Sequence, residues 1–257
     1  MIPLAPGRFS GLTRIGSALF MFVVVLPMAL SACRHPFGEH HLQGAALGTG
    51  YHITLYADLD DASLLALETG IQGELERLQR KRGLYVRALN AAFARVGMPA
   101  PAVLLGEMDR VVHALAVDRV TEWLDAHEEI AALVEMGGVM RAAGAPPDGG
   151  WRLSLERAGL PKRVEERYLY LHDAALVHRF TELEASPLIS LPTPLGVSVV
   201  ADTASEAMRQ ANRMMLARPD DAMAYAERTD RAARLVVKTP QGIVIHQTAA
   251  LEPWFEK

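Results

Sequence analysis

A glycine pair that follows a short apolar run is the segment whose residue types point most directly to chemistry. Residues 130–136 are mostly apolar, contain Glu135 and lead directly into Gly137 and Gly138. Glycine lets a backbone approach a bound phosphate group closely, because it has no side chain and tolerates positive φ angles. The same pair could instead form a β-bulge or a tight turn between two strands. We therefore expect Gly137 and Gly138 either to let the backbone approach a ligand or to form such a turn or bulge.

Isolated polar residues are further candidates for catalytic or metal-binding roles. His178 could act as a general base, but no acidic residue stands at a recognisable spacing from it, which favours a structural role. Asp118 could ligate a cation, although its place in a helical pattern favours a packing or surface role. Asp220 and Asp221 are typical of a helix N-terminus, where carboxylates complement the helix dipole. The residues alone assign no catalytic group and no metal site.

Composition and charge exclude several classes of protein. The chain has 257 residues, of which 50% are hydrophobic and 22% charged, so it is too apolar to be disordered. Lys and Arg number 26 against 30 Asp and Glu, which gives a formal net charge of −4. Without a basic excess, we expect no nucleic-acid partner. The single cysteine, Cys33, excludes an internal disulfide and a zinc site built from cysteines.

The first 32 residues resemble an export signal. They contain no Asp, Glu or Lys, and residues 15–32 are uncharged with a dense apolar run. The sequence Leu-Ser-Ala before Cys33 resembles the bacterial lipobox, in which the cysteine carries lipid and becomes the mature N-terminus. A plain membrane anchor with a chance cysteine is the alternative.

The lipobox implies a domain organisation and a location. We predict a signal peptide over residues 1–32, a solvated tether over 33–46 and one folded domain over 47–257. Lipid on Cys33 would hold the protein on a membrane of the bacterial cell envelope, facing the periplasm. The tether contains histidines that could bind a metal loosely, although nothing fixes their geometry. These are His35, His40 and His41.

Hydrophobic periodicity predicts an α+β fold. Apolar residues at helical spacing predict a helix over 64–78 that ends before Gly83, and another helix over 103–127. Residues 51–56 alternate as a strand does. The other expected elements are strands near 130–136, 139–144, 151–156, 167–171 and 197–201, helices from about 203 and over 220–229, and a hairpin over 234–247. Strands outnumber helices, and tight turns join many of them, which indicates the α+β class.

Five segments of this pattern, in order along the chain, resemble the FAD:protein FMN transferase (ApbE) family. They are residues 47–53, 89–92, 116–120, 134–151 and 197–212. The best preserved is the family's Glu-x-Gly-Gly strand, which Glu135, Gly137 and Gly138 match. These periplasmic, usually lipidated proteins move FMN from FAD onto a threonine of a target protein and release AMP.

The resemblance carries expectations about fold, ligand and partners. It implies mixed or antiparallel sheets with packed helices, in a domain that is shortened relative to the family. It implies FAD as a ligand, with Glu135, Gly137 and Gly138 in its binding site. It also implies either a flavoprotein target or another periplasmic protein as a partner.

The positions that carry the family's metal ligands differ in this chain. The family places an Asp and, four residues later, a Thr on one helix face, where their oxygens converge on a cation. Met208 and Asn212 occupy those two positions here. A thioether is a poor ligand for Mg²⁺ and an amide oxygen supplies no charge, so the sequence argues against bound Mg²⁺. His113 stands near the lysine of the family's Lys-Gly-Tyr signature.

These replacements leave three functions open. We favour an accessory or flavin-binding protein that keeps the fold without the transfer reaction. A transferase with a rearranged metal site is the second. An unrelated envelope scaffold lipoprotein without flavin is the third.

Overall fold

The structure is a computed structural model, and the residues that it describes are 38–127, 130–147, 149–155, 167–180 and 193–255. They belong to one compact unit that begins at Phe37. The expected signal peptide and Cys33 lie outside the described residues. Among the helices of the described part, none combines the length and the apolar character that a membrane span requires.

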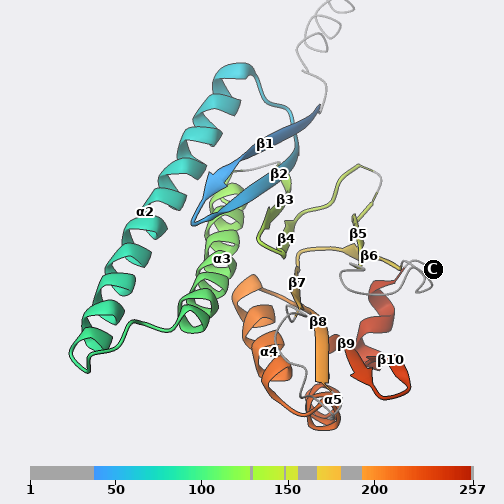
Figure 1. The fold of residues 1–257 in the computed structure, drawn as a ribbon. Helices are drawn as coiled ribbons and strands as arrows, with labels where there is room; N and C mark the ends of the chain where they lie inside the picture. The colour runs from blue at the N-terminus through green and yellow to red at the C-terminus, as the bar shows by residue number, and fades with distance from the viewer. Residues whose placement is uncertain (1–37, 128–129, 148, 156–166, 181–192, 256–257) are drawn as a thin grey trace, which may run out of the picture. The chain divides into compact units, whose positions relative to one another are not determined.

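An eight-stranded sheet forms the centre of this unit (Figure 1). Its strands lie in the order β1-β2-β3-β4-β7-β8-β9-β10, and every neighbouring pair is antiparallel. The strands are β1 (Gly38–Ala46), β2 (Thr49–Ala57), β3 (Ala131–Met136), β4 (Val139–Ala143), β7 (Ala175–Phe180), β8 (Thr193–Ala201), β9 (Ala232–Thr239) and β10 (Gly242–Gln247). A separate two-stranded sheet pairs β5 (Trp151–Ser154) with β6 (Tyr168–Leu171).

Both faces of the large sheet are covered over its middle strands. The helices are α2 (Asp61–Ala94), α3 (Ala102–Asp125), α4 (Ala204–Leu216), α5 (Pro219–Arg228) and the 3-10 helix η1 (Ala249–Trp254). One hydrophobic cluster joins a face of the sheet to α2, α3, α4 and α5, and a second joins the opposite face to β5, β6 and η1. Successive side chains alternate between the clusters, as Leu176 and Val177 of β7 do. The predicted α+β class is therefore confirmed.

The prediction of a tether is wrong for residues 38–46, which form strand β1. All nine residues of β1 pair with β2, from Gly38 opposite Ala57 to Ala46 opposite Thr49. Only Leu42 of the strand is buried, so its composition carries almost no hydrophobic signal. Main-chain hydrogen bonds hold this edge strand, and these bonds do not depend on side-chain pattern.

The predicted end of the first helix at Gly83 is also wrong. Helix α2 continues through Gly83 to Ala94, and the half-buried Val86, Leu89 and Phe93 follow Gly83 at helical spacing. A glycine inside an exposed helix costs only about 1 kcal/mol relative to alanine. The apolar residues beyond Gly83 are enough to carry the helix past it.

Candidate functional site

The glycine pair forms a two-residue turn between β3 and β4. Met136 pairs with Val139, and φ is 60° at Gly137 and 80° at Gly138. Positive φ at both central residues defines a type I′ turn, which matches the twist of the flanking strands. Of the expected alternatives, the backbone therefore adopts the tight turn. A ligand role for Glu135, Gly137 and Gly138 stays a prediction.

His113 of α3 connects this turn to the turn between β1 and β2. Its Nε2 donates a hydrogen bond to the carbonyl of Leu47, at 3.1 Å. Leu47 and Gly48 form the other two-residue turn, with φ of 56° and 87°. A Cβ added to Gly137 would lie 2.8 Å from His113 Nδ1, so the imidazole lies directly against that glycine. His113 therefore has a structural contact at the position that the resemblance gives to lysine.

We expect Gly137→Ala to lower the free energy of unfolding by roughly 1 kcal/mol more than Gly48→Ala. Both substitutions put a side chain at positive φ, but a Cβ at Gly48 meets no atom within 4 Å. The difference between them isolates the contact with His113, and urea unfolding measures it. In a His113→Ala background the difference should vanish. Equal losses of unfolding free energy for the two variants in the wild-type background would mean that the His113 ring moves away from Gly137 at no measurable cost.

A row of buried polar side chains crosses the sheet from the same turn. The backbone N–H of His178 donates to the carbonyl of Gly138, at 2.9 Å. His178 of β7 pairs with Ser198 of β8, and Ser198 pairs with Arg234 of β9. The three residues are only 7%, 7% and 5% exposed, respectively, on a face where the preceding row is Leu176, Val200 and Ala232. We call His178, Ser198 and Arg234 the polar row.

Glu135 lies on the same face of the sheet as the polar row. It pairs with Met140, which in turn pairs with Leu176, and His178 is two residues farther along that strand. The Glu135 side chain is half-buried and stands opposite the exposed His52 of β2. The fold thus brings Glu135, Gly138 and His178 to one end of one face.

The polar row contains donors without partners. His178 Nδ1 lies 2.9 Å from Ser198 Oγ, whereas His178 Nε2 is buried and has no hydrogen-bond partner among the described residues. Burial and, as a smaller effect, the positive charge of Arg234 together lower the pKa of His178 to about 4, so the ring is neutral at pH 7. Burial also lowers the pKa of Arg234, and the charge of Arg167 adds to this effect.

Arg234 makes no side-chain hydrogen bond or ion pair with any residue in the described part of the chain. A largely buried cation without a partner is costly. A neutral imidazole and a guanidinium together form a donor set for an anionic group, such as a phosphate or a carboxylate.

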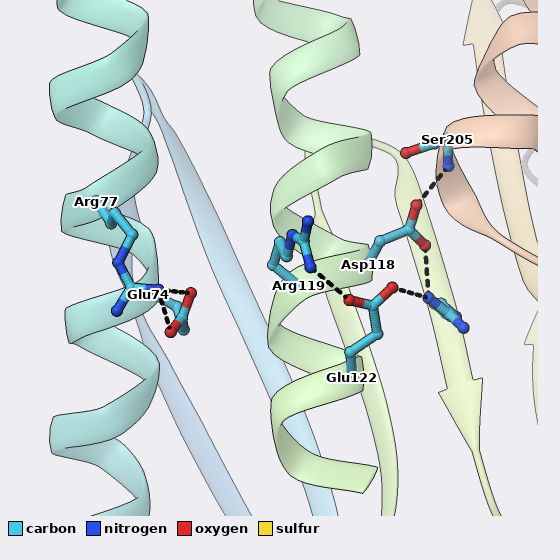
Figure 2. Close-up of polar contacts among 7 residues, drawn as sticks. Glu74, Arg77, Asp118, Arg119, Glu122 and Ser205 are labelled. Carbon is cyan, nitrogen blue, oxygen red and sulfur yellow. Dashed lines mark hydrogen bonds and ion pairs between the residues drawn. The ribbon is translucent and has the colours of Figure 1, made fainter. Parts of the chain in front are cut away.

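Asp118 is fully engaged in holding the N-terminus of α4. Its Oδ1 accepts hydrogen bonds from the N–H of Ala204 and from Arg141, both at 2.8 Å, and its Oδ2 accepts from the N–H of Ser205 at 2.8 Å. Figure 2 shows the Asp118 side chain pointing from α3 to Ser205. Glu122 extends this network to Arg119 at 3.0 Å. These contacts support the packing role and leave Asp118 no role as a cation ligand.

The positions aligned with the family's metal ligands do not form a cation site. Met208 is 2% exposed and packs in the hydrophobic cluster under α4. Asn212 Oδ1 accepts a hydrogen bond from Arg179 at 2.6 Å, and Arg179 also donates to Glu107 at 2.8 Å. Within the described residues, no three His, Cys, Asp or Glu side chains are grouped to hold a metal ion. The Arg179 guanidinium therefore already uses the Asn212 oxygen that a cation at this position would need as a ligand.

Comparison with known proteins identifies the fold. No protein-family model and no curated protein match the sequence. Three solved structures match at TM-scores of 0.64, 0.63 and 0.60: the flavin transferase ApbE from Vibrio cholerae, the flavinyl transferase ApbE from Pseudomonas stutzeri and the ApbE protein from Thermotoga maritima. The chain has an ApbE-like fold. The respective sequence identities are 17%, 18% and 12%, over 85%, 85% and 86% of this chain and 100%, 97% and 100% of theirs.

The ApbE-like fold confirms the expectation drawn from the five matched segments. The match spans most of the chain, including both halves of the large sheet, so the resemblance is not confined to a local motif. At these identities the likeness concerns the fold alone. Which ligands this chain binds must be argued from its own residues.

Proposed function

We propose that the protein is a lipid-anchored, periplasm-facing protein that binds a flavin nucleotide and does not carry out metal-dependent FMN transfer. The observation that carries the proposal is that neither the buried Arg234 side chain nor the buried His178 Nε2, both in the polar row, has a partner among the described residues. The ApbE-like fold makes FAD the ligand to test first. The lipobox at Cys33 supports the anchor.

The polar row suits an anionic group of a nucleotide. When Ser198 Oγ donates to His178 Nδ1, the ring proton resides on Nε2, which then supplies an N–H donor that a ligand could use. Arg234 adds a permanently charged planar donor. Gly138 has no side chain next to His178, and a Cβ there would lie 3.3 Å from the His178 carbonyl oxygen. The residues present therefore fit a phosphate of FAD or FMN.

The described residues offer no comparable support for the FMN-transfer reaction. Cleavage of the FAD pyrophosphate requires a divalent cation that screens the phosphates and polarises the attacked phosphorus. Met208 is buried in an apolar cluster and the Asn212 oxygen is occupied by Arg179, so these two positions offer no cation site. We therefore favour FAD or FMN as a bound ligand and an accessory role toward a periplasmic partner.

Titration of the purified protein with FAD and with riboflavin tests the proposal. We expect FAD to bind and to raise the melting temperature by mass action. Riboflavin lacks the phosphates, and its affinity should be lower by about 10- to 100-fold, the usual worth of a charge-assisted hydrogen bond. Arg234→Met should lower the FAD affinity by the same factor, leave riboflavin binding unchanged and keep or raise the melting temperature without ligand.

Arg228→Met is the matched control, because Arg228 is an exposed arginine on α5. It should leave both affinities unchanged. Equal affinity for FAD and riboflavin, or an Arg234 variant that binds FAD normally, would contradict the phosphate contact. The absence of any flavin binding would favour the scaffold function. Release of AMP from FAD with Mg²⁺ and a threonine-containing peptide would overturn the accessory role.

A further inference from the structure

The hairpin of α2 and α3 extends beyond the part that packs on the sheet. The first half of α2 buries Leu67, Ile71, Leu75 and Leu78. From there to Ala114 of α3, no residue is buried. Figure 1 shows the C-terminal half of α2 continuing past β1 and β2 to the loop that joins it to α3. We call residues 79–106 the arm.

The arm is basic, although the chain as a whole is acidic. It contains five basic residues and no Asp or Glu. The basic residues are Arg80, Lys81, Arg82, Arg87 and Arg95. Subtracting them from the 26 Lys and Arg leaves 21 against 30 acidic residues in the rest of the chain.

Only two of these charges are paired with a described residue. Arg80 lies 3.5 Å from Glu76, and Arg82 lies 2.6 Å from Asp109, both acids being outside the arm. Lys81, Arg87 and Arg95 are exposed and form no ion pair within the described residues. The arm therefore presents positive charge that the described part of the chain does not neutralise.

The same segment exposes large apolar side chains. Their exposed fractions are 60% for Leu84, 66% for Tyr85, 69% for Val96, 56% for Met98 and 75% for Val103. Val96 and Met98 lie in the loop, and Val103 lies in the first turn of α3, so three of the five surround the tip. Single exposed apolar residues are ordinary, but a concentration of them marks an interaction surface.

We propose that the arm docks on an anionic phospholipid surface. Apolar side chains at a protruding tip can enter the boundary between headgroups and acyl chains, while arginine and lysine stay at the level of the phosphates. Tyrosine is favoured at the same depth, because its ring is apolar and its hydroxyl polar. An arm of unbalanced positive charge complements such a surface, whereas the rest of the chain has an excess of acidic residues.

Vesicle sedimentation with the chain from Phe37 onward tests the proposal, because that chain contains every described helix, strand and core residue and lacks the N-terminal apolar segment. Circular dichroism first verifies that each protein is folded. We expect binding to phosphatidylcholine vesicles that contain phosphatidylglycerol, no binding to pure phosphatidylcholine, and weakening by salt. The triple variant Lys81→Gln, Arg87→Gln, Arg95→Gln should bind roughly 100-fold more weakly, at about fivefold per charge.

The control is Arg218→Gln, Arg228→Gln, Lys238→Gln. It removes the same charge from exposed positions on other elements, and its vesicle affinity should equal that of the wild type. A second variant, Val96→Ser with Met98→Ser and Val103→Ser, should abolish the binding that survives high salt. Equal binding to neutral vesicles, or equal losses in the arm and control variants, would overturn the proposal. Binding to heparin or DNA but not to vesicles would overturn it too, and would indicate an acidic macromolecule as the partner.

Discussion

Asp118→Ala is expected to lower the free energy of unfolding by about 3–5 kcal/mol, the cost of removing one partner of a buried ion pair. Asp118 is 4% exposed and accepts hydrogen bonds from Arg141 and from two backbone N–H groups of α4. Alanine would leave those N–H groups at a helix N-terminus without an acceptor and would remove the nearest carboxylate from Arg141. Thr203 would still cap α4 through the N–H of Glu206, so we expect the helix to weaken rather than to unwind.

Urea unfolding of four variants separates the parts of this cost. Asp118→Asn keeps an oxygen of the same shape without the charge, and should cost less than Asp118→Ala. Arg141→Met tests the ion pair alone, and the double variant Asp118→Ala, Arg141→Met gives their coupling. Asp125→Ala is the control, since Asp125 is an exposed aspartate at the end of the same helix. A loss below about 1 kcal/mol for Asp118→Ala would mean that the contacts contribute no more than an ordinary neutral hydrogen bond.

The network around Asp118 marks the limit of what the sequence predicts. Helical periodicity correctly predicts α3 and a helix that begins near residue 203, where Thr203 caps α4 as threonine often does. Asp118 and Ala204 are far apart in sequence, and nothing in either segment indicates that they meet. The choice between a ligand and a packing role therefore depended on the tertiary structure.

The candidate site was predictable in part for a related reason. The glycine pair is conspicuous in the sequence, but its type I′ geometry follows from the pairing of Met136 with Val139. His178 is also a predicted candidate, whereas Ser198 and Arg234 lie within apolar strands and were not predicted as site residues. A polar or charged residue inside an apolar strand is the sequence signal that could have indicated both as candidate site residues. That the three share one row depends on strand register, which a single sequence does not specify.

The pH dependence of stability is the second large effect, and it tests the polar row directly. The pKa of His178 is about 4 in the folded protein, against 6.5 for an ordinary histidine. The unfolded chain therefore takes up the proton first as the pH falls. The stability that comes from the neutral ring is complete above pH 6.5 and is lost progressively as the pH approaches 4. Over this window we expect a loss of roughly 3 kcal/mol.

Thermal or urea unfolding between pH 7 and pH 4 measures this slope for wild type, His178→Gln and His246→Gln. Carboxylates also titrate near the lower end, so the slope of the wild type relative to His178→Gln isolates the histidine. The exposed His246 should leave the slope unchanged. Because the charge of Arg234 helps to hold the His178 pKa low, an anion bound between the two should raise it and flatten the slope. A flatter slope with FAD but not with riboflavin would connect the stability of the sheet to nucleotide binding. Identical slopes for wild type and His178→Gln would show that the ring reaches solvent.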